Sequence, residues 1–115
     1  MFFNLTKLTL TTAPVTLNEG LEILERDQHR CRYCGLDGNA SFENALAMSV
    51  DFVKPRARKG KKDPNNLVAC CRTCNAIKGK KVYDSFEAAK KHVLEQRAEL
   101  RKTWEENNKQ RPGKP

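Results

Sequence analysis

The fold is decided by one stretch of the sequence, residues 48–81, which reads MSVDFVKPRARKGKKDPNNLVACCRTCNAIKGKK. Residues 48–53 alternate and are rich in β-branched and aromatic side chains, which predicts a strand ended by Pro55. A basic loop with turn-forming residues follows over 54–65, and an extended apolar segment begins at Asn66. The stretch then forms a Cys-x-x-Cys pair and predicts a short helix closed by Gly79.

A second Cys-x-x-Cys pair, Cys31 and Cys34, precedes this stretch and matches the pair formed by Cys71 and Cys74. Together the two pairs offer four thiolates, the number that closes a tetrahedral zinc site. Disulfides are uncommon in a reducing cytosol and no βαβ pattern flanks either pair, so structural zinc is preferred to four buried thiols or a redox pair. Cys70 could replace Cys71 as a ligand, but Cys71 keeps the spacing to Cys74, so Cys70 is assigned to the core.

Two helices are predicted to flank this centre. Thr16 and Glu19 form a capping-box pattern that predicts a helix over about 17–29, leading into the first cysteine pair. A second amphipathic helix is predicted over about 86–106 and is expected to pack on the core. Its apolar stripe consists of Phe86, Ala89, Val93, Gln96 or Arg97, Leu100 and Trp104. Between the cysteine pairs, Gly35 is expected to have a positive φ, and residues 36–46 predict an irregular or short helical link.

The length of 115 residues, with 38% hydrophobic residues, predicts one small domain and excludes a two-domain enzyme. We expect an N-terminal arm over 1–15, a single domain over 16–106 with its core at about 20–82, and a flexible tail over 107–115. The chain has no run of about 18 apolar residues, and its first ten residues lack the features of a signal peptide. A soluble, cytoplasmic protein is therefore expected.

The formal net charge of +8 points to a polyanionic partner. The positive charge is concentrated between residues 54 and 81, where Asp63 is the sole acidic residue. The candidate DNA-binding residues are Lys54, Arg56, Arg58, Lys59, Lys61, Lys62, Arg72, Lys78, Lys80 and Lys81. This segment has few apolar residues to insert into a membrane, so double-stranded DNA is the preferred partner, with a merely solvated basic loop as the alternative. RNA is less favoured because no aromatic-rich platform for single strands is present.

The order of these features resembles the HNH endonucleases, the ββα-metal group. The resemblance covers about residues 20–82 and rests on the combination of an Asp-bearing strand, a basic loop, the Asn66-Leu-Val segment and Cys71-x-x-Cys74-Asn75. It implies an α+β fold with a small ββα-metal core, stabilised by the four-cysteine zinc site and flanked by the two helices. No membrane and no small-molecule substrate is expected as a partner.

The resemblance also implies roles for individual residues. Asp51 and Asn75 would be ligands of a catalytic Mg²⁺ or Mn²⁺, and Asn66 would tie down the loop through hydrogen bonds. Hard oxygen ligands suit such an ion, which can neutralise a scissile phosphate and activate water. A loop-capping role for Asp51 and a helix-capping role for Asn75 are the structural alternatives.

One position departs from the family pattern. The histidine that would follow Asp51 and accept a proton from the attacking water is Phe52, which cannot accept a proton. A base could come from elsewhere, with Lys54 and His29 nearest along the chain. The chain could instead be a relative that binds DNA without cutting it, or an altered sequence. The remaining histidine, His92, lies in the predicted C-terminal helix.

The function expected from the sequence is therefore a metal-dependent DNA endonuclease or nickase. The alternative is a zinc-stabilised DNA-binding module that has lost its general base. Divalent-ion binding distinguishes the two, because a pure binding module has no reason to retain two hard ligands around an open site.

Overall fold

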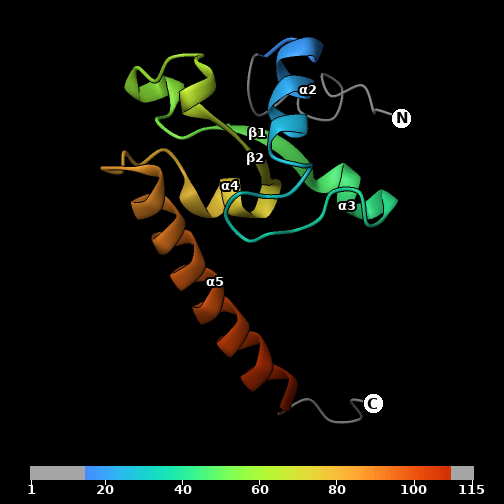
Figure 1. Ribbon diagram of the computed structural model, residues 1–115. Coiled ribbons are helices and arrows are strands. Elements are labelled where there is room, and N and C mark those ends of the chain that lie inside the picture. The colour runs from blue at the N-terminus through green and yellow to red at the C-terminus, as the bar shows by residue number, and fades with distance from the viewer. Residues whose placement is uncertain (1–14, 110–115) are drawn as a thin grey trace.

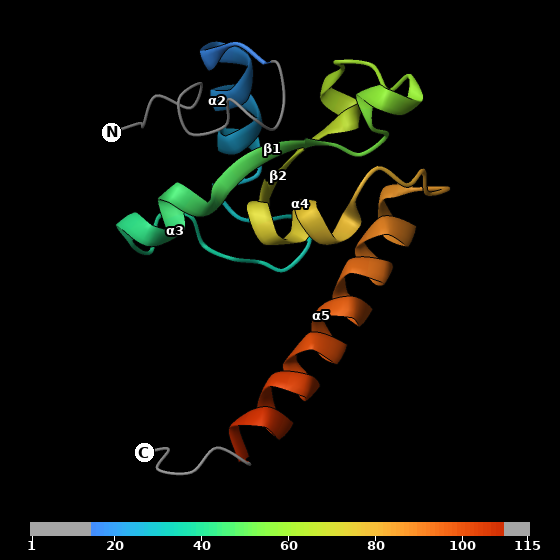
Figure 2. The ribbon, with the colours of Figure 1, turned by 180° about the vertical axis from the view of Figure 1, so that it is seen from behind.

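The computed structural model describes residues 15–109 and builds the domain around two strands. Strands β1 (Met48–Phe52) and β2 (Leu67–Cys71) pair antiparallel, with Met48 opposite Cys71 and Asp51 opposite Val68. Helix α2 (Leu17–Arg26) lies on one side of this ribbon and helix α4 (Arg72–Lys78) on the other (Figures 1 and 2). The predicted α+β class and the strand–strand–helix order of the small ββα-metal core are confirmed.

All five residues of β1 are buried because both faces of the ribbon are covered. The pleat alternates side chains between the faces. Met48, Val50 and Phe52 join an apolar cluster with Ile23 and Leu24 of α2. Ser49 and Asp51 are buried polar residues on the intervening positions. The sheet therefore has one apolar face and one face with buried polar groups.

The opposite face of the ribbon packs against the cysteines and against α5 (Phe86–Lys109). This second cluster contains Tyr33 from the first cysteine pair, Val68 and Cys70 from β2, and Ala89 and Val93 from α5. Cys70 has no exposed surface, which agrees with its assignment to the core. The loop that holds the first cysteine pair is thus packed directly against the strand that precedes the second.

Helix α2 begins as predicted and ends early. Thr16 and Glu19 form the capping box, in which the Thr16 amide donates to the Glu19 carboxylate at 2.8 Å and the Glu19 amide donates to the Thr16 hydroxyl at 3.2 Å. The helix ends at Arg26, three residues before the predicted end. Gln28 and His29 have positive φ values of 57° and 56°, which turn the chain toward the first cysteine pair.

Helix α5 begins at the predicted residue, continues to Lys109 and projects away from the domain (Figure 1). Ala89 and Val93 are fully buried against the core, as predicted. Leu100 and Trp104 are 58% and 59% exposed, so the expectation that the whole stripe packs on the core is wrong. Helix α4 has only seven residues and cannot cover a helix of 24.

The remaining connections are short. Helix α3 (Phe42–Ala47) occupies part of the predicted irregular link, and 3₁₀ turns span Arg56–Arg58 and Pro64–Asn66. Gly35 has a φ of 81° and Gly79 a φ of 65°, as the sequence predicts for residues that leave a cysteine pair and a helix. No helix within residues 15–109 is long and apolar enough to cross a membrane. The predicted N-terminal arm, apart from Val15, and residues 110–115 of the predicted tail lie outside the described residues.

Candidate functional site

The four paired cysteines converge from two distant parts of the sequence. Their sulfur atoms all lie within 4.8 Å of one another, and the sulfurs of Cys34 and Cys71 are 3.8 Å apart. Four sulfurs around Zn²⁺ at about 2.3 Å would lie about 3.8 Å apart, so the cluster fits a tetrahedral zinc site. Cys71 caps helix α4, and its sulfur accepts the amide hydrogen of Cys74. The spacing of the second pair is therefore fixed by the start of a helix.

The four thiols of this cluster differ in their acidity: hydrogen bonds with Cys31 and Cys34 raise the pKa of both Cys71 and Cys74. Hydrogen bonds from Cys34, Cys71 and Cys74 hold the pKa of the Cys31 thiol well below its usual range. Arg97 of α5 reaches the cluster with its Nη1 atom 3.7 Å from the Cys74 sulfur. Because four thiolates around Zn²⁺ would carry a net negative charge, this guanidinium would partly neutralise a zinc-bound cluster. Burial raises the pKa of Cys70, so that thiol stays neutral.

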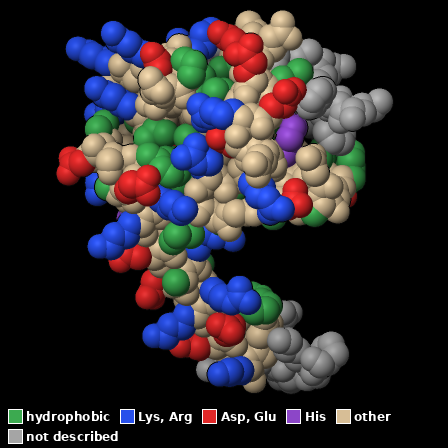
Figure 3. Space-filling view, viewed as in Figure 1, with side chains coloured by type: hydrophobic (Ala, Val, Ile, Leu, Met, Phe, Trp, Pro, Cys, Tyr) green, Lys and Arg blue, Asp and Glu red, His purple; other side chains and the backbone are tan. Residues whose placement is uncertain are grey.

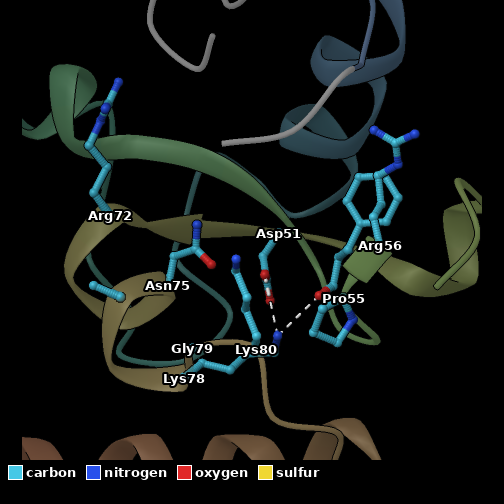
Figure 4. Close-up of a pocket in the computed structure, with 10 residues that line it drawn as sticks. Asp51, Pro55, Arg56, Arg72, Asn75, Lys78, Gly79 and Lys80 are labelled. Atoms are coloured by element: carbon cyan, nitrogen blue, oxygen red, sulfur yellow. Dashed lines mark hydrogen bonds and ion pairs between the residues drawn. The ribbon is translucent and has the colours of Figure 1, made fainter. Parts of the chain in front are cut away.

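A pocket of about 450 Å³ opens between the end of β1 and helix α4 (Figure 4). The charged and amide residues that line it are Asp51, Arg56, Arg72, Asn75, Lys78 and Lys80. Asp51, Asn75 and Lys80 point toward a common space in Figure 4, and Arg56 and Arg72 lie on its two sides. The pocket thus combines four cations with a single carboxylate. Phosphate groups are a suitable ligand for such a lining.

Asp51 is 5% exposed and has a hydrogen bond at each oxygen. The Tyr33 hydroxyl donates to Oδ2 at 2.7 Å, and the Lys78 ammonium lies 3.5 Å from Oδ1. Lys78 also donates to the Phe52 carbonyl at 3.0 Å. Burial raises the pKa of Asp51, while Lys78 and Tyr33 act in the opposite direction. Asp51 is thus a buried strand residue facing the pocket, and the loop-capping alternative does not describe it.

Asn75 and Asn66 occupy different places in the site. Asn75 lies inside α4 and lines the pocket, whereas the cap of that helix is Cys71. Asn66 pins the basic loop: its Oδ1 accepts the Lys54 amide at 2.8 Å, and its Nδ2 donates to the carbonyls of Lys54 and Lys61 at 3.1 and 2.9 Å. The Asn66 side chain therefore connects Lys54 and Lys61 of the basic loop.

Phe52 lines the pocket and is also part of the apolar core. It is 6% exposed and packs in the cluster with Ile23 and Leu67. The two candidate substitutes for the missing histidine, His29 and Lys54, do not line the pocket. His92 lies beside Tyr83, with the ring centroids 5.5 Å apart.

Nine of the ten predicted DNA-binding residues are exposed, and Lys78 is the exception at 2% exposure. Figure 3 shows Lys and Arg side chains gathered over the loop that leaves β1. Lys62 forms a salt bridge with Glu19 at 3.1 Å, and Lys81 lies 5.4 Å from the centre of the Tyr83 ring. The basic loop therefore presents a positive surface that continues into the pocket through Arg56.

Residues 31–81 match the family model described as HNH endonuclease. This part of the chain is therefore similar to an HNH domain. The match begins at Cys31 and ends after helix α4, so both cysteine pairs and the pocket lie within it. No curated protein and no solved structure matches the chain. HNH domains act on nucleic acids, which agrees with the positive surface around the pocket.

Two residues of the candidate site have contacts that the sequence did not predict. The sequence pattern assigns no role to Tyr33, and it predicts Lys78 only as a DNA-binding residue. Tyr33 lies between Cys31 and Cys34, and folding of that loop brings its hydroxyl to Asp51. Residues 33 and 51 are far apart in sequence and share no pattern, so no local signal could predict the contact.

Proposed function

We propose that this protein is a divalent-metal-dependent endonuclease that hydrolyses phosphodiester bonds in double-stranded DNA. One observation carries the proposal: Asp51 and Asn75, the two oxygen donors implied by the family pattern, line one pocket within the HNH domain. The cations around that pocket suit the flanking phosphates. The four-thiolate cluster, which fits structural zinc, is compatible with a reducing cytoplasm.

The donor set fits Mg²⁺ or Mn²⁺. These ions take oxygen ligands, and Mg²⁺ commonly keeps several waters and uses one or two carboxylates together with substrate phosphates. Asp51 supplies a carboxylate, Asn75 supplies an amide oxygen, and the pocket has room for water and a phosphate group. When bound, such an ion would stabilise charge on the scissile phosphate and lower the pKa of a water ligand.

The other residues would bind and orient the substrate. Arg56, Arg72 and Lys80 line the pocket from three segments and would hold the phosphates on either side of the scissile bond. Asn66 holds the basic loop in place, which positions Arg56. Tyr33 fixes the orientation of Asp51. Phe52 supplies no base, so we expect slow cleavage.

Plasmid nicking tests this proposal. Zinc-loaded protein should convert supercoiled DNA to the open-circular form in Mg²⁺ or Mn²⁺ and not in EDTA. Asp51→Asn and Asn75→Ala should each reduce the rate by about 100-fold or more. Asn65→Ala is the control: this asparagine is exposed and does not line the pocket, so its substitution should leave the nicking rate unchanged. Nicking that survives both pocket substitutions would contradict the proposed site.

A second function is favoured by two specific observations: Phe52 replaces the base, and Asp51 already has partners at both oxygens. In this alternative the domain binds DNA through the same cations without cutting it. Wild-type protein that binds duplex DNA, retains its zinc and never nicks it in either ion would favour the binding module.

A further inference from the structure

Among the four cations that line the pocket, Lys78 is the buried one. Its ammonium lies 3.5 Å from Oδ1 of Asp51 and 3.0 Å from the Phe52 carbonyl oxygen. The other Asp51 oxygen accepts the Tyr33 hydroxyl at 2.7 Å. Arg56, Arg72 and Lys80 are exposed side chains at the rim. Lys78 therefore occupies the one Asp51 oxygen that Tyr33 does not, which is the oxygen that an ion would have to take from it.

A divalent ion and this ammonium would compete for the same oxygen. A Mg²⁺ ligand oxygen lies about 2.0–2.1 Å from the ion. With the ammonium 3.5 Å from that oxygen, the two cations would be close neighbours in a largely buried space. Repulsion between them is poorly screened there. A phosphate group in the pocket would reduce this repulsion, because its negative charge can pair with the ammonium that the ion displaces.

We propose that Lys78 is a tethered counter-ion that holds the Asp51 carboxylate until a divalent ion and a phosphodiester enter the pocket together. This inference rests on the proposed function, since it takes Asp51 as an ion ligand. It makes Lys78 a positioning residue that couples ion binding to nucleic-acid binding. The free protein then binds the ion weakly, and a phosphodiester strengthens that binding.

Manganese titrations of the zinc-loaded full chain test the inference without any cleavage. Free Mn²⁺ is measured by electron paramagnetic resonance, and zinc content is checked before and after. Lys78→Met should bind Mn²⁺ about tenfold more tightly than the wild type. Lys80→Met removes the same charge from the same pocket without contacting Asp51, and should change the affinity less than about threefold. Dimethyl phosphate should strengthen Mn²⁺ binding more in the wild type than in Lys78→Met.

The controls separate this inference from the proposed function. Lys78→Gln removes the charge but can still donate to the Phe52 carbonyl, so it replaces Lys78→Met if that variant does not fold. Equal affinities for Lys80→Met and the Lys78 variant would overturn the counter-ion role. Asp51→Asn should abolish Mn²⁺ binding in the pocket. If Asp51→Asn leaves the Mn²⁺ affinity unchanged, Asp51 is not an ion ligand, and the ion site of the proposed function is contradicted as well.

Discussion

At the scale of single residues, Asp27 is an organising contact outside the pocket. Its carboxylate accepts Arg26 at 2.9 and 3.0 Å, Arg32 at 3.2 Å and the Ala69 amide at 2.9 Å. These bonds join the end of α2 to the first cysteine pair and to β2. The side chain is only 4% exposed. Asp27 thereby ties together three segments, two of which carry the paired cysteines.

Asp27→Asn should lower the free energy of unfolding by about 2 kcal/mol, because charge-assisted hydrogen bonds to a buried carboxylate are lost. Hydrogen bonds from Arg26 and Ala69 outweigh burial and lower the pKa of Asp27. The stabilisation is therefore present above the unfolded pKa of about 3.9 and is lost as pH falls through the lower folded pKa. Urea titrations should give the same difference at pH 6, 7 and 8. The exposed Asp84→Asn is the control, and a difference that disappears within this range would contradict the assignment.

In the pocket, the sequence predicts the candidate ion ligands but not the residues that contact them. Asp51 and Asn75 were predicted as a pair from motif order, and both line the pocket. The partners of Asp51 were not predicted, because Tyr33 and Lys78 reach it from other segments. Phe52 was expected only as the position of a missing base, and its packing in the apolar core depends on α2.

At the scale of elements, hydrogen bonds to its backbone fix the conformation of the basic loop, while its charged side chains stay exposed. The Asn66 side chain bonds Lys54 at the start of the loop and Lys61 within it, and the Gly60 amide donates to the Pro55 carbonyl at 2.9 Å. A Cβ on Gly60 would lie 1.6 Å from the Lys54 carbonyl oxygen, so this close approach requires glycine. The loop therefore presents its lysines and arginines from a defined backbone.

Replacing Arg56, Arg58, Lys59 and Lys61 together by Ala should flatten the salt dependence of DNA binding. If about five basic residues contact phosphates, log K falls against log salt with a slope near −4 to −5. Removing four such contacts should bring the slope close to −1. The measurement is fluorescence anisotropy over a range of salt concentrations.

A matched control removes the same charge from α5, where Lys91, Arg101, Lys102 and Lys109 are exposed. Their replacement by Ala should leave the slope unchanged. A flattened slope in the α5 variant and an unchanged one in the loop variant would place the DNA on the long helix instead.

Helices were predicted well at their starts and poorly at their ends. The capping box fixed the start of α2, whose end depends on the positive φ of Gln28 and His29. For α5 the sequence pattern predicts an apolar stripe as far as Trp104. Periodicity cannot predict that the partner helix α4 ends before that stripe does, because the length of a packing partner is a tertiary property.

At the scale of the whole molecule, stability is expected to depend on the zinc cluster. The cysteines form much of the second core cluster and connect the loop before β1 with the helix after β2. Structural zinc contributes about 10–16 kcal/mol in small domains, which is comparable to the total stability of a typical protein. Folding and zinc binding should thus be a single event.

Cys34→Ser should abolish the cooperative thermal transition and the bound zinc. Circular dichroism and elemental analysis measure the two effects. Cys70→Ala changes a fully buried cysteine outside the cluster and should retain one zinc per chain with a lower melting temperature. Wild-type melting with one bound zinc in Cys34→Ser would show that the ligand set is wrong.

Hydrolysis of DNA in the pocket of Asp51 and Asn75 can be tested in a single plasmid assay that compares substitutions of Phe52 side by side. Phe52 lines that pocket, so Phe52→His places an imidazole at its wall, whereas Phe52→Leu keeps the wall apolar. General-base catalysis contributes about 10²–10⁴-fold.

Phe52→His should nick the plasmid about 100-fold faster than the wild type in Mg²⁺ or Mn²⁺. Phe52→Leu should give no gain, and adding Asp51→Ala to Phe52→His should remove the gain. A folded Phe52→His variant that binds DNA as well as the wild type and leaves the plasmid supercoiled in both ions would contradict DNA hydrolysis in this pocket.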